Sequence, residues 1–187
     1  MRFSIRSTVP LLVLIPGLAS ACWEQAAKKH NVPTVLLLAI ADTESGMNPA
    51  AVNNSHVRRT KTVDIGYMQV NSDPRVLRNL GVSKQDLFEP CTNINAGARI
   101  LSEKIARHGY TWEAVGAYNA ACVAMTAEQC LRTRMRYAWR VYRSLMRRLA
   151  PSQPESTWLA AAAPLYSVSL RSTTPPSRAE LKWAQAR

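Results

Sequence analysis

Hydrophobic residues recur at helical spacing through most of the chain. Residues 23–30 predict a short helix, and residues 34–44 predict a longer one that begins after Pro33. The second helix is apolar on nearly every face, so we expect it to be buried at the centre of the fold. Gly46 and Pro49 end it.

Three more predicted helices follow. Apolar residues from Ile94 to Ile105 keep helical spacing until Gly109 stops the pattern. Residues 112–119 form the next predicted helix and residues 131–149 the last. An apolar stripe on the last helix is supplied in part by Trp139, Tyr142 and Leu145.

The segments between these helices carry little regular pattern. Residues 48–61 are polar and loop-like, and residues 86–90 predict a turn. Residues 63–70 alternate weakly, which predicts a short strand or an extended turn. We therefore expect one compact, mainly α domain with minimal sheet over residues 22–150.

The two ends of the chain differ from this domain. A positive start, an apolar run and a small-residue cleavage site ending at Ala21 predict a secretory signal peptide over residues 1–21. A buried N-terminal helix is the alternative. The apolar run is too short for a membrane span, which needs roughly 20 residues. We therefore expect an exported, periplasmic protein with no transmembrane span in the mature chain.

Residues 151–187 are rich in Pro, Ser, Thr and Ala. This composition predicts a mostly disordered tail, because it offers little apolar surface to bury. A dispensable tail is the simpler interpretation, and a partner-docking segment is the other.

The chain has four cysteines, Cys22, Cys91, Cys122 and Cys130. An even number in an exported chain indicates disulfides, and four cysteines allow three pairings. We favour Cys22–Cys91, which would tie the new N-terminus to the core, and Cys122–Cys130, which would close a short loop between two helices. Lipidation of Cys22 is disfavoured, because Ala19 stands where such sites usually carry Leu. Metal binding is disfavoured too, since there is no C-x-x-C motif and the histidines are scattered.

The composition is that of a globular protein with an unusually basic surface. Apolar residues make up 47% of the chain, and 24 Lys+Arg against 12 Asp+Glu give a net charge of +12. Such a charge attracts nucleic acid, anionic lipid or an acidic wall polymer. Seven arginines crowd the last predicted helix: Arg132, Arg134, Arg136, Arg140, Arg143, Arg147 and Arg148. These arginines either form a solvated face or attract a wall polymer or a partner protein. Export and the lack of a DNA-binding motif disfavour nucleic acid as the ligand.

Glu44 is the leading candidate for chemistry. It closes the very apolar helix 34–44, and partial desolvation at such a position raises the pKa of a carboxyl group. A carboxyl that keeps its proton near neutral pH can protonate a leaving oxygen. Ser45, next to it, would bind substrate or the acid. Taken alone, the segment is equally compatible with a solvated carboxylate at a helix end.

Two later segments add polar groups that suit a sugar site. In residues 64–71, Gln69 and Asn71 alternate, so we expect both amides on one side of an extended segment. Gly66 there permits a close approach to the backbone. In residues 114–120, Tyr118 can pack and still offer its hydroxyl.

These segments together resemble the soluble lytic transglycosylases, the lysozyme-like enzymes that cut peptidoglycan. The match consists of Glu44-Ser45-Gly46, then Gly66-Tyr67-Met68-Gln69-Val70-Asn71, then Ala117-Tyr118-Asn119-Ala120, in that order. Within the family the chain resembles small exported members that accompany conjugation, type III secretion and type IV pilus systems. Cys22-Trp23 and Glu89-Pro90-Cys91 resemble features of those members, which supports the first disulfide. Ala121 departs from the usual Gly, which leaves the geometry of the next loop open.

The resemblance implies cleavage of the β-1,4 bond between N-acetylmuramic acid and N-acetylglucosamine, with no cofactor. Glu44 would protonate the glycosidic oxygen and then take a proton from the 6-hydroxyl of the sugar, which closes a 1,6-anhydro ring. Gln69, Asn71, Tyr118 and Asn119 would hold the sugar or orient the acid. Such an enzyme opens the wall locally for a transport machine.

Asp64 leaves an alternative open. It could stabilise positive charge at the anomeric carbon or make the enzyme a lysozyme-type hydrolase with Glu44, and it could equally pair with Arg58, Arg59 or Lys61. Asp42 lies roughly 200° around the helix from Glu44, so we expect it to be structural. A lysozyme-like module that binds glycan without cutting it is the third alternative.

Overall fold

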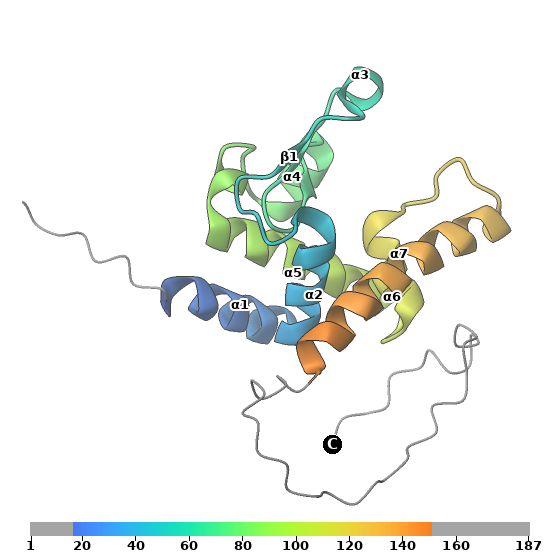
Figure 1. Cartoon of the computed structure of the whole chain (residues 1–187). Helices are drawn as coiled ribbons and strands as arrows, with labels where there is room; N and C mark the ends of the chain where they lie inside the picture. Colours follow the sequence, from blue (N-terminus) through green and yellow to red (C-terminus); the bar gives the residue numbers. More distant parts are fainter. Residues whose placement is uncertain (1–16, 151–187) are drawn as a thin grey trace, which may run out of the picture.

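The computed structural model describes residues 17–150, and within them the chain is mostly helical with one small sheet (Figure 1). The helices are α1 (Gly17–His30), α2 (Thr34–Ser45), α3 (Val57–Thr60), α4 (Pro74–Leu80), η1 (Asp86–Phe88, a 3₁₀ helix), α5 (Pro90–His108), α6 (Trp112–Asn119) and α7 (Ala127–Leu149). The strands are β1 (Val52–Asn53), β2 (Asp64–Ile65) and β3 (Val70–Asn71). The predicted tail and residues 1–16 of the predicted signal peptide lie outside the described residues.

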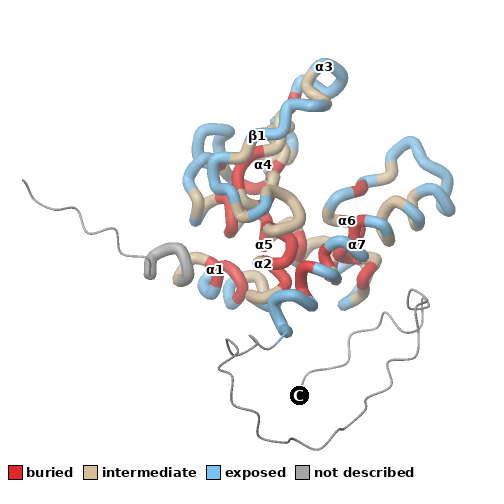
Figure 2. Tube along the Cα trace, viewed as in Figure 1, coloured by how far each residue is buried: buried red, intermediate tan, exposed pale blue. Residues whose placement is uncertain are grey.

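Helix α2 is the centre of the core, as its apolar pattern predicts. Its buried residues include Leu36, Leu37 and Ile40, and it packs against α1, α5 and α7. Gly46 ends the helix in the left-handed conformation, where its N–H bonds to the carbonyl oxygens of Asp42 and Ala41. Figure 2 shows burial concentrated on α2 and α5, whereas α3 and the connection between α6 and α7 are exposed.

The sheet forms a small arm beyond the C-terminal end of α2. Its strands pair antiparallel in the order β1-β2-β3. One row of cross-strand partners is apolar, and within it Ile65 and Val70 are buried. The other row is polar and places Asp64 between Asn53 and Asn71. The two-residue strands agree with the expectation of minimal sheet.

A buried amide fastens this arm to α5. The Nδ2 of Asn93 donates to the carbonyl oxygens of Ile65 (2.8 Å) and Leu87 (3.0 Å), and its Oδ1 accepts from the N–H of Met68 (2.9 Å). A Cβ on Gly66, where φ is +76°, would lie 2.4 Å from the Asn93 amide nitrogen. The close approach predicted at Gly66 is therefore an approach to Asn93.

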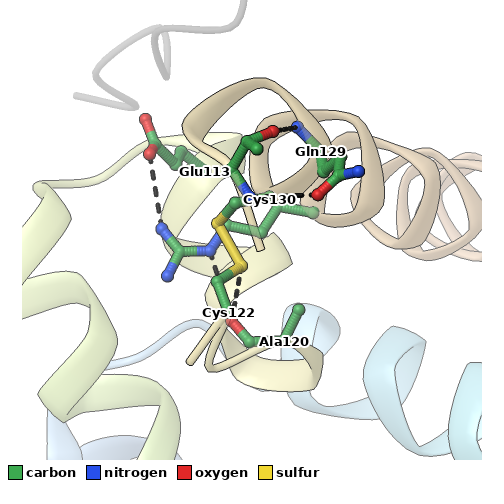
Figure 3. Close-up of a disulfide and its surroundings, with 7 residues drawn as sticks. Glu113, Ala120, Cys122, Gln129 and Cys130 are labelled. Atoms are coloured by element: carbon green, nitrogen blue, oxygen red, sulfur yellow. Dashed lines mark hydrogen bonds and ion pairs between the residues drawn. A yellow bond between two sulfur atoms is a disulfide. The ribbon is translucent and has the colours of Figure 1, made fainter. Parts of the chain in front are cut away.

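Both predicted disulfides are present. Cys22–Cys91 joins α1 to the start of α5, with the Cα atoms 5.3 Å apart. Cys122–Cys130 joins the loop after α6 to the first turns of α7, with the Cα atoms 5.4 Å apart (Figure 3). The left-handed conformation in that loop falls on Cys122, next to Ala121.

Several predicted boundaries need correction. The first helix starts at Gly17, and the last starts at Ala127, where Thr126 and Gln129 form a capping box. Helix α4 was not predicted, although Asp73-Pro74 is a helix start, and the loop-like 48–61 contains β1 and α3. In the predicted stripe of α7, Leu145 is buried and Tyr142 partly so, but Trp139 is 40% exposed.

Candidate active site

Glu44 lies in the last turn of α2, and Tyr137 of α7 reaches it. The Tyr137 hydroxyl donates to Glu44 Oε1 at 2.6 Å, and the tyrosine itself is only 1% exposed. These residues are 93 positions apart, so the packing of α7 on α2 creates the contact. One oxygen of the acid is therefore held in place, while the Glu44 side chain keeps partial access to solvent.

The surroundings of Glu44 favour its protonated form. Burial raises its pKa above the ordinary value of 4.5, and the negative charge of Asp64 adds to this effect. The Tyr137 hydrogen bond and the positive charge of Arg140 oppose it, but the net direction is upward. This agrees with the pKa shift expected from the apolar helix, and it suits a group that donates a proton near neutral pH.

Asp64 has a different environment, on the polar row of the arm. Its Oδ1 accepts from Asn71 Nδ2 at 2.6 Å, and its Oδ2 accepts from Asn53 Nδ2 at 3.3 Å. His56 Nε2 lies 3.7 Å from the same Oδ2. The partners of Asp64 are therefore two amides and a histidine. The alternative pairing with Arg58, Arg59 or Lys61 is not what the described residues show.

The expected alternation of Gln69 and Asn71 is wrong. Gln69 lies in the turn before β3 with φ at +47°, which period-two spacing cannot reveal. Its Nε2 donates to the carbonyl oxygens of Gly66 (3.0 Å) and Ala51 (3.3 Å). Asn71 lies in the strand itself, so the two amides have separate environments: one braces the turn and the other holds Asp64.

Ser45 and Tyr118 tie the arm to the helices. The Ser45 hydroxyl lies 2.9 Å from the carbonyl oxygen of Tyr67 and 3.0 Å from that of Ala41, so one proton is shared between them. The Tyr118 hydroxyl donates to the carbonyl oxygen of Met68 at 2.8 Å. Burial raises the pKa of Tyr118 well above its usual value, so this hydroxyl stays neutral. Both contacts fix the segment between β2 and β3 beside the end of α2.

Two other predicted residues lie apart from these contacts. Asn119 is exposed at the end of α6, just beyond Tyr118. Asp42 faces away from the acid, as expected, and accepts from the Ser144 hydroxyl (2.6 Å) and from Arg147 (2.9 Å). The Ser144 hydrogen bond, aided by Arg147, lowers the pKa of Asp42 below its ordinary value.

Three residues that shape the site were not among the site residues predicted from the sequence: Tyr137, Arg140 and Asn93. Tyr137 and Arg140 fall within the predicted last helix, but only its packing shows that they face Glu44. Arg140 lies over the Tyr137 ring, with Cζ 5.4 Å from the ring centroid. Asn93 is a polar residue in an apolar helical pattern, which is the one signal that could have indicated a buried hydrogen-bonding role.

The described part of the chain shows no group of three or more His, Cys, Asp or Glu side chains that could hold a metal ion. Among residues 17–150, no helix is long and apolar enough to cross a membrane.

Comparison with known proteins matches this chain to one family. The model of the transglycosylase SLT domain matches residues 21–131. Protein IpgF of Shigella flexneri is 40% identical over 146 residues, which cover 76% of this chain and 91% of that protein. Invasion protein IagB of Salmonella typhimurium is 43% identical over 129 residues, or 66% of this chain and 76% of that protein.

A solved structure shows the same fold. The X-ray structure of an inactive mutant of the lytic transglycosylase Slt from Pseudomonas aeruginosa aligns with a TM-score of 0.53 and 22% identity. The alignment covers 76% of this chain but only 26% of that larger enzyme. This likeness confirms the predicted lysozyme-like, mainly α fold. The family match and the relatives establish that the chain belongs to the transglycosylase SLT family and is a peptidoglycan lytic transglycosylase.

Proposed function

We propose that the enzyme cuts the β-1,4 bond between N-acetylmuramic acid and N-acetylglucosamine and leaves a 1,6-anhydro end. The observation that carries this proposal is the environment of Glu44, a carboxyl with a raised pKa that is held by one buried tyrosine hydroxyl. An acid prepared in this way can act twice, first as a donor and then as an acceptor of a proton.

In the first step, Glu44 gives its proton to the glycosidic oxygen, and the bond from that oxygen to the anomeric carbon breaks. The glycan that leaves carries the new hydroxyl. The Glu44 carboxylate then takes the proton of the 6-hydroxyl of the muramic acid, and that oxygen bonds to the anomeric carbon. Water is not consumed, and Glu44 ends the cycle protonated again. The attack is intramolecular, which gives it a large advantage over a free nucleophile.

The other predicted residues support this step in two ways. Ser45, Tyr118 and the amide nitrogen of Gln69 already bond to the backbone, so we assign them to positioning. We assign the exposed Asn119 and the side-chain oxygen of Gln69 to direct contact with the sugar.

Asp64 is assigned an electrostatic role. Its negative charge raises the pKa of Glu44, and an ionised Asp64 would favour positive charge at the anomeric carbon. Asn53 and Asn71 donate to its two oxygens and so fix the orientation of the side chain. Activation of water by Asp64 would instead give a hydrolase, and the masses of the products distinguish these outcomes.

The cellular role follows from the resemblance of the sequence. We propose export through cleavage of residues 1–21, action in the periplasm, and local opening of the wall for a secretion, conjugation or pilus apparatus. The two disulfides support an oxidising compartment, and the similarity to an invasion protein supports a link to such a machine.

The test is digestion of purified sacculi by the wild type, Glu44→Gln and a control, Glu24→Gln, which removes an exposed carboxylate on α1. We expect Glu44→Gln to lose about 10²- to 10⁴-fold or more in muropeptide release while still sedimenting with sacculi. The control should match the wild type. The products should be one water lighter than hydrolysis products.

Each other outcome contradicts a stated part of the proposal. Unchanged release by Glu44→Gln would reject Glu44 as the acid. Reducing ends from the wild type would identify a muramidase, and binding without any release would identify a non-catalytic module.

A further inference from the structure

Three arginines form a row along the exposed face of α7. Arg136, Arg140 and Arg143 are all exposed and stand at positions i, i+4 and i+7. On an α-helix this spacing places them on one side. Along the axis, Arg140 is about 6 Å and Arg143 about 10 Å from Arg136. Trp139 flanks the row, 40% exposed, and stacks on Tyr142 with the ring centroids 5.1 Å apart.

This arginine row differs from the other arginines of the helix. Arg132 pairs with Glu128, Arg134 with Glu113, and Arg147 and Arg148 with Asp42. Arg136, Arg140 and Arg143, in contrast, form no ion pair within residues 17–150. From Cys130 to the end of α7 there is no acidic residue at all. The row therefore has no ion-pair partner among the described residues.

The row also passes close to the candidate acid. Arg140 lies over the ring of Tyr137, whose hydroxyl bonds to Glu44. Arg140 and Glu44 thus contact the same tyrosine, one over its ring and the other at its hydroxyl. The sugar rings and N-acetyl groups of the glycan carry no charge, so a row of cations gains little from the glycan backbone itself.

We propose that the arginine row binds the carboxylates of the peptide stem on the muramic acid that is being cut. This inference rests on the proposed function, because the stem branches from the sugar next to the scissile bond. A stem peptide carries free carboxylates separated by one or two residues of about 3.5 Å each. That separation matches the spacing of the row, and guanidinium groups bind carboxylates in a bidentate manner.

The test measures binding apart from cleavage. Full-length protein carrying Glu44→Gln is sedimented with intact sacculi and with sacculi whose stems an amidase has removed. The row is neutralised by Arg136→Gln, Arg140→Gln and Arg143→Gln together. A control loses the same charge elsewhere through Lys28→Gln, Lys29→Gln and Arg78→Gln, all exposed on α1 and α4.

We expect the row variant to bind intact sacculi about tenfold more weakly, since three exposed ion pairs together contribute on the order of that factor. The control should bind within twofold of its parent. Removal of the stems should weaken the parent to the level of the row variant and leave the row variant unchanged. Replacement of the three arginines by Lys should restore part of the binding, because charge is kept and the bidentate geometry is lost.

Two results would overturn the proposal. Equal losses in the row variant and the control would indicate general attraction to a polyanion. Undiminished binding of the parent to stripped sacculi would show that the stems are not the ligand, and would favour an acidic protein partner for the row. Failure of the proposed cleavage would appear separately, as no muropeptide release by the wild type, and would leave the binding result to stand alone.

Discussion

The two carboxyl groups nearest the site occupy opposite kinds of surroundings. Glu44 ends a buried helix, receives one hydrogen bond from a buried tyrosine, and has its pKa raised by burial. Asp64 lies on a two-residue strand between Asn53 and Asn71, with His56 nearby. The buried setting of Glu44 stabilises its bound proton, and the charge of Asp64 adds to this effect. The proposed roles follow this difference, with proton transfer by Glu44 and an electrostatic contribution from Asp64.

The two regions also differ in how they are held. Glu44 is part of the core, because α2 packs against three other helices. The arm that carries Asp64 adds only Ile65, Met68 and Val70 to the core. Hydrogen bonds from Asn93, Ser45 and Tyr118 also hold it. A change in these contacts should move Asp64 while leaving Glu44 in place.

The largest effect is expected from Asn93→Ala. The substitution leaves the N–H of Met68 and the carbonyl oxygens of Ile65 and Leu87 without their partner in a buried site. We expect a loss of about 3 kcal/mol in the free energy of unfolding, or a fall of roughly 10 °C in Tm, measured by thermal and urea denaturation. The control is Asn95→Ala, which loses one half-buried contact to His30 and should cost about 1 kcal/mol. Equal losses would show that Asn93 does not hold the arm.

A smaller effect is expected from Asp64→Asn, which tests the electrostatic role. Muropeptide release should fall about tenfold, because one charge near the reaction centre is lost. Asp64 raises the pKa of Glu44, so its removal lowers that pKa, and the alkaline limb of the rate profile should move to lower pH. The products should still be anhydro muropeptides. Glu24→Gln serves as the control. If the wild type instead releases reducing ends and Asp64→Asn releases none, Asp64 is part of a hydrolase.

The same two regions show what the sequence can predict. The central helix follows from a local pattern: an apolar run from Val35 to Ala41, followed by the stop at Gly46. Glu44 became the leading candidate only when the later segments were added to this pattern. Both disulfides agree with the favoured pairing. The helix depends on neighbouring residues, and the pairing was favoured among only three alternatives with support from the family resemblance, so both could be predicted without the fold.

The partners of these residues could not be derived in this way. Tyr137 contacts Glu44 because of the orientation in which α7 packs against α2. Helical periodicity does not predict that orientation, because the two residues are 93 positions apart in the sequence. In the arm, alternation failed at Gln69 because this residue adopts a positive φ in the turn before β3 and lies outside the paired strands. Long-range packing and single backbone conformations therefore account for most of what was missed.

Tyr137→Phe should have a modest effect on rate and a clear effect on the pH profile. The hydroxyl stabilises the carboxylate form of Glu44, so its loss raises the pKa of Glu44 further. The alkaline limb should move to higher pH, opposite to the shift from Asp64→Asn. The maximal rate should fall about three- to tenfold, since one positioning hydrogen bond is lost. Tyr142→Phe removes a hydroxyl from the same helix, and an identical shift from it would rule out a specific role for Tyr137.

The smallest effect concerns stability and tests the burial of Glu44 directly. Because the folded state raises the pKa of Glu44, folded protein binds this proton more tightly than unfolded protein does. The contribution of Glu44 to the free energy of unfolding is therefore fully present at pH values below 4.5, its ordinary pKa. This contribution is lost as the pH rises through the pKa that Glu44 has in the folded protein. Glu44→Gln does not titrate, so its stability relative to the wild type should increase from pH 4 to pH 8. Urea denaturation at several pH values measures this difference. Glu24→Gln, on the exposed side of α1, should show none, and a pH-independent difference for Glu44→Gln would mean that the acid is no more buried in the folded chain than in the unfolded one.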